Sequence, residues 1–115
     1  MLFPYTTKLI NSNAQVFVET ANPNVFDVLS CCQEIIPPMD RKQVSLGFRV
    51  YLPGNKILLI TNYNTLLSTN GIGTLTQTIK HTDKSEIFIT LFNYTKIKYM
   101  VRKHQKIAEA ILLSI

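Results

Sequence analysis

Hydrophobic and polar residues alternate most regularly in the last third of the chain. Over residues 87–92, β-branched and aromatic residues fall on both faces of a period-two pattern, which predicts a strand. Lys98–Val101 predicts a second strand, and Ile107–Leu113 predicts a third after the polar tip Arg102–Lys106. Ala108–Ala110 would also suit a helix, but the segment is short, so we expect a strand there.

The rest of the chain follows the same pattern in shorter pieces. Alternating or apolar runs predict five more strands, at Gln15–Glu19, Val25–Cys32, Gln43–Tyr51, Lys56–Asn62 and Thr74–Ile79. Turn residues separate them, and Pro37-Pro38 ends the apolar pair before it. A helical period occurs only in part of Thr65–Asn70. The chain is therefore expected to be all-β, a jelly roll or β-sandwich of roughly eight to ten short strands.

Length and composition favour one small domain that associates with itself. We expect residues 1–115 to form a single domain, with 1–24 as a lead-in of one strand and turns. Only 17% of the residues are charged and 46% are hydrophobic, which indicates a surface partly covered in an oligomer. The net charge is +5, but the basic residues are scattered, which argues against nucleic-acid binding. The densest basic stretch, Lys96–Lys106, is interpreted as a solvated edge.

The cysteines and the ends of the chain bear on its compartment. Cys31 and Cys32 are adjacent, a spacing that disfavours a disulfide between them and lacks the pattern of a zinc site. His81 and His104 are expected on the surface, so no metal is predicted. No secretory signal or membrane span is expected. These features predict a protein of the cytoplasm, the nucleus or both.

Four short motifs in the chain occur together in one known family. They are Glu34–Met39 (EIIPPM), Val50–Pro53 (VYLP), Leu91–Asn93 (LFN) and Lys106–Ala108 (KIA). In this combination the chain resembles the trimeric dUTPases from Val25 to its last residue. The resemblance implies a β jelly roll that forms a homotrimer, with active sites between subunits that hydrolyse dUTP to dUMP and pyrophosphate.

The stretch that matches the family's third motif departs from it at the catalytic position. Lys80 stands where the family has the aspartate that activates water, and a charged ammonium group cannot act as a general base. Asp83 stands where the family has the tyrosine that stacks under deoxyribose. No catalytic residue is therefore assigned.

The other motifs are altered as well. Tyr63 and Asn64 replace an arginine and a serine that contact phosphate, and Glu109 replaces a glutamine with a carboxylate that would repel triphosphate. The family's glycine-rich C-terminal arm is absent from this sequence. Asp27 and Lys106 match the family, although Asp27 also suits a carboxylate that caps a turn. The vestigial nucleotide pocket would consist of Asp27, Tyr63, Asn64, Lys80, Asp83, Lys106 and Glu109.

In combining a dUTPase-like scaffold with an altered active site, this chain resembles the dUTPase-derived products of the first open reading frame of adenovirus early region four. Those proteins lack dUTPase activity and act by binding host proteins, partly through a C-terminal PDZ ligand. Here the corresponding tail is Leu113-Ser114-Ile115, with leucine where the motif has serine or threonine. If the tail completes the last strand, it is expected to be buried and not a ligand.

Three hypotheses follow. The first is a catalytically inactive viral protein that contacts host proteins in an infected cell and needs no cofactor. The second is a divergent active dUTP hydrolase that uses Asp83 or Asp27 with Mg²⁺. The third is a purely structural β module.

Overall fold

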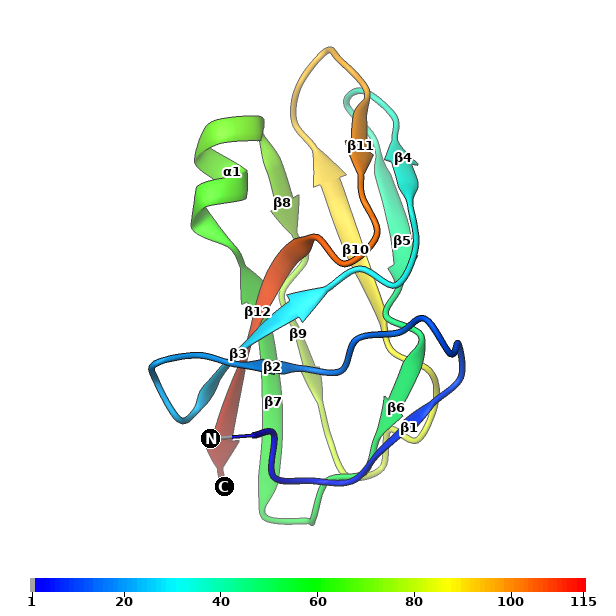
Figure 1. The fold of residues 1–115 in the computed structure, drawn as a ribbon. Coiled ribbons are helices and arrows are strands. Elements are labelled where there is room, and N and C mark those ends of the chain that lie inside the picture. The colour runs from blue at the N-terminus through cyan, green and yellow to red at the C-terminus, as the bar shows by residue number, and fades with distance from the viewer. Residues whose placement is uncertain (1) are drawn as a thin grey trace.

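Strands make up nearly all of the regular structure in the computed structural model, which describes residues 2–115 (Figure 1). The strands are β1 (Thr7–Leu9), β2 (Val18–Glu19), β3 (Val25–Leu29), β4 (Glu34–Ile36), β5 (Arg41–Ser45), β6 (Phe48–Val50), β7 (Lys56–Asn62), β8 (Ile72–Thr74), β9 (Gln77–Ile79), β10 (Phe88–Asn93), β11 (Tyr99–Val101) and β12 (Lys106–Ser114). One helix, α1 (Asn64–Asn70), follows β7. The predicted all-β class is confirmed, and so is the strand over Ala108–Ala110.

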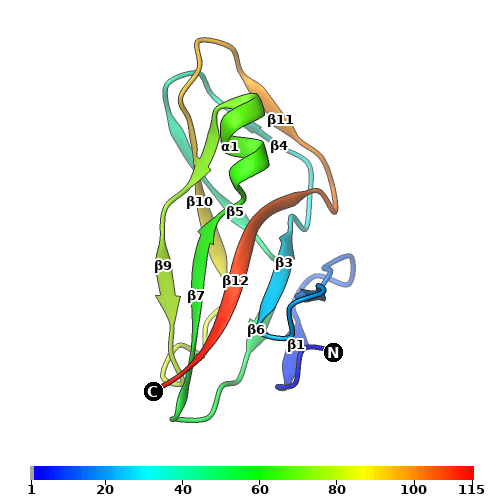
Figure 2. The same ribbon diagram turned by 90° about the vertical axis from the view of Figure 1, so that its left-hand side faces the viewer.

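The strands form antiparallel sheets that pack on each other (Figure 2). The largest sheet has the order β2-β3-β12-β7-β9, and a second has the order β5-β10-β8. Two ladders, β1-β6 and β11-β4, complete the structure within residues 2–115. The last strand of the chain, β12, therefore lies in the middle of the largest sheet.

The core lies between these sheets and follows the alternation seen in the sequence. In β10, Ile89 and Leu91 are fully buried, while Phe88, Thr90 and Phe92 face outwards. Burying one such aliphatic side chain stabilises the fold by roughly 1.5–3 kcal/mol. The other large side chains that are fully buried include Phe26, Ile36, Phe48, Leu58, Ile60 and Ile107.

Two segments predicted as single strands are each divided in two, so these predictions were wrong in extent. Gln43–Tyr51 bends at Gly47, whose φ of +77° an L-residue rarely adopts. Because of the bend, β5 pairs with β10 while β6 pairs with β1. Thr74–Ile79 separates in the same way, since β8 pairs with β10 and β9 pairs with β7.

The N-terminal segment is part of the core. The Phe17 ring lies 5.0 Å from the Phe48 ring, and the Phe3 ring lies 5.2 Å from the Phe26 ring, measured between centroids. The strand predicted at Gln15–Glu19 is regular only at Val18–Glu19, and that at Val25–Cys32 ends at Leu29.

The short helix is where the sequence shows its only helical period. It ends at Gly71, whose φ of +68° and N–H bonds to two preceding carbonyl groups form a left-handed cap. Leu66 anchors its buried face. In residues 2–115 no helix is long and apolar enough to cross a membrane.

Candidate functional site

Two carboxylates face each other in the middle of the largest sheet. Asp27 of β3 and Glu109 of β12 are direct cross-strand partners, so their side chains share one face. The register of β12 against β3 shifts between Lys106 and Ala108. This irregularity adds a residue to β12 and turns the Lys106 side chain to the face that carries the two carboxylates. Asp27 therefore lies within a strand, and the alternative of a carboxylate capping a turn was wrong.

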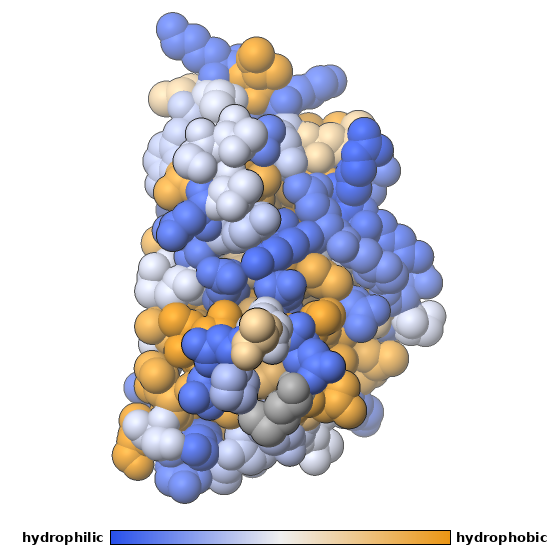
Figure 3. Space-filling model, turned by 60° about the vertical axis from the view of Figure 1, so that its left-hand side comes forward, coloured by the Kyte–Doolittle hydropathy of each residue, from blue (hydrophilic) through white to orange (hydrophobic). Residues whose placement is uncertain are grey.

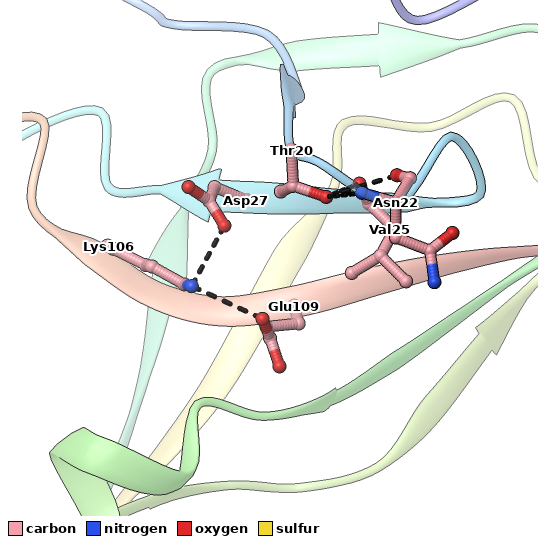
Figure 4. Close-up of polar contacts among 6 residues, drawn as sticks. All are labelled: Thr20, Asn22, Val25, Asp27, Lys106 and Glu109. Atoms are coloured by element: carbon pink, nitrogen blue, oxygen red, sulfur yellow. Dashed lines mark hydrogen bonds and ion pairs between the residues drawn. The ribbon is translucent and has the colours of Figure 1, made fainter. Parts of the chain in front are cut away.

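The Lys106 ammonium group lies between the two carboxylates (Figure 4). Its Nζ is 2.9 Å from Asp27 Oδ1 and 3.2 Å from Glu109 Oε2. Burial lowers the pKa of Lys106, but the hydrogen bonds and charges of Asp27 and Glu109 outweigh burial and raise it. Lys106 is thus half-buried and paired, and its predicted place in a solvated edge was wrong.

An aromatic ring covers the lysine from a third direction. The Lys106 Nζ lies 4.0 Å from the ring centroid of Tyr63, a cation–π distance. Tyr63 follows β7 and precedes α1, where its side chain makes no capping hydrogen bond. Asn64 is the first residue of the helix and is exposed. The ammonium group therefore has two carboxylates and a π-face as partners, with a net charge of −1 on the three charged side chains.

Lys80 and Asp83 lie in the connection between β9 and β10. Asp83 Oδ2 accepts a hydrogen bond from the Lys80 backbone N–H at 2.8 Å, and the Asp83 N–H donates to the Lys80 carbonyl at 3.0 Å. Both groups are exposed, and the carboxylate closes a turn. Ile79, at the start of this turn, is level with Leu112 across β7. Lys106 is six residues before Leu112 along β12, so the Lys80–Asp83 turn lies roughly 20 Å from Lys106.

A pocket of about 350 Å³ opens between β9 and β10, beside the Lys80–Asp83 turn. It is lined by residues from both sides of the connection, among them Gln77, Thr78, Asp83, Lys84, Glu86 and Phe88. The Gln77 side chain donates to the Phe88 carbonyl at 3.1 Å and holds the two strands at this spacing. The sequence predicted a polar loop here, and no pattern in it indicates the pocket.

The C-terminal tail completes β12. Leu113 and Ser114 pair with Ile57 and Lys56 of β7, and the Ile115 N–H donates to the Asn55 carbonyl at 2.9 Å. All three tail side chains are nevertheless exposed. The expectation that a tail within the strand is buried was therefore wrong, because its backbone is paired while its side chains face solvent. Elsewhere in the described chain, no three His, Cys, Asp or Glu residues gather as a metal site needs.

Comparison with known proteins identifies the fold. No protein-family model matches this sequence, and no curated protein matches it. A mutant dUTPase from phage phi11 of Staphylococcus aureus superposes with a TM-score of 0.87 at 14% identity, covering 96% of this chain and 90% of its own. The dUTPase of Staphylococcus bacteriophage 80alpha gives 0.87 at 16% identity, covering 96% and 89%. A mutant of the phage 80alpha dUTPase gives 0.88 at 16% identity, covering 100% of this chain and 86% of its own.

The fold is that of the dUTPases. The likeness to the adenovirus proteins stays a prediction.

Within this dUTPase fold, the chain brings four of the seven predicted pocket positions into one cluster. Asp27, Lys106 and Glu109 are joined by ion pairs, and Tyr63 packs on the lysine. Asn64 follows Tyr63 directly, whereas Lys80 and Asp83 stand apart from the cluster within this subunit.

Proposed function

We propose that this chain is a dUTPase-like protein that does not hydrolyse dUTP and acts by contacting host proteins in a virus-infected cell. The observation that carries the proposal is the engagement of Lys106 by Asp27 and Glu109. The proposed compartment is the cytoplasm, the nucleus or both, and no cofactor is required.

The Lys106 cluster is poorly suited to a triphosphate. A phosphate group that approached the ammonium would have to displace a carboxylate at 2.9 Å or 3.2 Å. The displaced carboxylate would then face the phosphate without a cation between them. The Tyr63 phenol cannot supply the paired donors that an arginine offers to phosphate oxygens.

The third-motif turn is also poorly suited to activating water. Lys80 carries the wrong charge for a general base. The Asp83 carboxylate is hydrogen-bonded to the Lys80 backbone N–H, so recruiting it would open the turn.

The outward face of the β5-β10-β8 sheet supports self-association, which we propose to be a homotrimer. Leu75, next to β8, is 54% exposed and Phe88 of β10 is 42% exposed. The Leu75 N–H donates to the Thr90 carbonyl, so the two apolar side chains border the same face. In sedimentation experiments we expect Phe88→Asp to dissociate the trimer, while Tyr51→Asp, at a side chain of similar exposure elsewhere, leaves it intact.

The structural neighbours support a regulatory use of the fold. The phage 80alpha dUTPases are described as controlling transfer of virulence genes by a proto-oncogenic G protein-like mechanism. A PDZ domain is a less favoured partner, because residues 113–115 would have to leave β7 to pair with it. Pull-downs with the full chain and with a chain lacking Ser114 and Ile115 test that route.

The decisive experiment measures pyrophosphate release from dUTP with Mg²⁺ at high protein concentration. Lys80→Asp is assayed beside the wild type, with Lys84→Asp as a control that changes charge equally in the same exposed connection. Calorimetry with dUTP and dUMP accompanies the assay. We expect no turnover by wild type above the blank without protein. Turnover by wild type would overturn the proposal, and Asp83→Asn would then test the carboxylate.

A further inference from the structure

Two loops meet at the end of the molecule opposite the two chain termini (Figure 1). Residues 37–40 connect β4 to β5, and residues 94–98 connect β10 to β11. The Met39 N–H donates to the Thr95 carbonyl at 3.0 Å and joins the two loops. The surface formed by Met39, Lys96, Ile97 and Lys98 is called the loop tip below.

A buried asparagine makes the loop tip rigid. The Asn93 side chain is fully buried, and its Nδ2 donates to the carbonyl groups of Ile36 and Ile97 at 3.1 and 2.8 Å. Its Oδ1 accepts the Thr95 N–H at 2.9 Å. These bonds hold the second loop from both of its sides and against β4. The exposure of Ile97 is therefore a fixed property of the fold.

The loop tip presents apolar side chains to solvent. Ile97 is 75% exposed and Met39 is 66% exposed. Met39 also has a φ of +54°, a backbone conformation that is uncommon for a residue other than glycine. Ile35 and Met100, cross-strand partners in β4 and β11, extend the exposed apolar surface.

The charge around these apolar side chains is positive. Lys96 and Lys98 flank Ile97 and are exposed, and no ion pair in residues 2–115 reaches either of them. Asp40, next to Met39, accepts the Arg41 N–H at 2.7 Å and keeps its charge, so Lys96 and Lys98 outnumber it at the loop tip. Glu34 of β4 is paired with Lys42 at 2.9 Å. Figure 3 shows hydrophobic atoms projecting among hydrophilic ones at the top of the molecule.

We propose that the loop tip binds anionic lipid surfaces, with Ile97 and Met39 in the headgroup layer and Lys96 and Lys98 on lipid phosphates. Lysine is depleted in protein–protein interfaces, whereas exposed apolar side chains flanked by lysine suit an anionic membrane surface. The loop tip is also a convex end and not a groove, which suits a deformable partner. This inference does not depend on the proposed loss of dUTPase activity.

Co-sedimentation with vesicles tests the proposal. The probes are vesicles of phosphatidylcholine alone and of phosphatidylcholine with phosphatidylserine. We expect the wild type to bind only the vesicles that contain phosphatidylserine, and to release them as salt is raised. Ile97→Asp should weaken binding about tenfold, and the double variant Lys96→Glu, Lys98→Glu should weaken it by at least about tenfold.

The chain offers a matched control for each change. Ile115 is 74% exposed at the opposite end, so Ile115→Asp alters an equally exposed isoleucine away from the loop tip. The double variant Lys8→Glu, Lys84→Glu changes the net charge as much as the loop-tip double variant. Both controls should bind as the wild type does. Equal losses in controls and loop-tip variants would overturn the proposal, since net charge would then account for binding, and so would absence of binding by wild type.

Discussion

Asp27 and Glu109 stand directly opposite each other on β3 and β12, two like charges on one face of an antiparallel pair. Such a pair destabilises a sheet unless a cation lies between its members. Lys106 is that cation, and it reaches both carboxylates because the strand is irregular just after it. Lys106 and Glu109 therefore depend on each other in this chain.

Removing the cation should destabilise the fold. We expect Lys106→Met to lower the free energy of unfolding by about 2 kcal/mol, because two half-buried carboxylates then face each other. Chemical denaturation measures the loss. In the double variant Lys106→Met, Glu109→Gln much of the stability should return, since only one charge remains. A double variant no more stable than Lys106→Met would contradict this account, since repulsion between the two carboxylates would then not cause the loss.

The same cluster predicts a response to alkaline pH. The pKa of Lys106 is raised in the folded chain by Asp27 and Glu109, so the folded state holds this proton more tightly than the unfolded state. Its contribution is complete below the ordinary lysine value of 10.5 and is lost as the pH rises through the higher folded value. The difference in unfolding free energy between wild type and Lys106→Met should therefore be constant up to about pH 10.5 and shrink above it. A difference that shrinks already near neutral pH would contradict this.

The two adjacent thiols should differ in reactivity. Burial, reinforced by the Cys32 thiol 3.4 Å away, raises the pKa of Cys31 from 9.0 to about 11. Cys32 is exposed. With a thiol reagent below pH 9.0 we expect one fast-reacting group per folded chain, lost in Cys32→Ser and kept in Cys31→Ser. Because the unfolded chain releases the Cys31 proton first, this thiol also makes unfolding easier as the pH rises from 9.0 to about 11.

Asn93, the last residue of β10, should be far more sensitive to substitution than an exposed asparagine. Asn93→Ala removes four hydrogen bonds from a fully buried site. It leaves the Ile36 carbonyl without the Asn93 donor, whereas the Ile97 carbonyl still accepts from Thr95 Oγ1 at 2.9 Å. We expect a loss of about 3 kcal/mol in the free energy of unfolding. Asn64→Ala, at an exposed asparagine, should change stability by less than about 0.5 kcal/mol. Equal effects at the two positions would contradict the role given to the buried amide.

Gly47 should not tolerate a side chain. A Cβ there would lie 2.7 Å from Cys31 Sγ and 2.8 Å from Ala14 Cβ, on a backbone whose φ is +77°. We expect Gly47→Ala to cost at least about 2 kcal/mol of stability, from strain and from overpacking. At Gly54 no atom lies within 4 Å of such a Cβ, so Gly54→Ala should leave the stability nearly unchanged. Thermal unfolding of the two variants measures the difference.

The fold class was predictable from the sequence because strand periodicity is a local property. The alternation over residues 87–92 located β10, and the single helical period located α1. The divisions at Gly47 and after Thr74 were not predictable, since hydrophobic alternation continues through Gly47 and no glycine or proline interrupts Thr74–Ile79. Which neighbour each half pairs with is decided by tertiary packing.

The candidate site was predictable only in part, and for a similar reason. Motif positions pointed to Asp27, Tyr63, Lys106 and Glu109, which lie together. Their contacts did not follow from the sequence, because the irregularity between Lys106 and Ala108 decides which face the lysine occupies. No residue pattern marks that irregularity. The loop tip was overlooked because Ile97, alone between two lysines, has no periodic partner.

The central position of β12 has a consequence for synthesis on the ribosome. Its neighbours β3 and β7 are made long before it, and neither pairs with the other. Until residues 106–114 emerge, both strands keep an open hydrogen-bonding edge beside apolar side chains, the state most exposed to aggregation and proteolysis. Ribosomes that stall before this strand should therefore release products that chaperones and proteases remove.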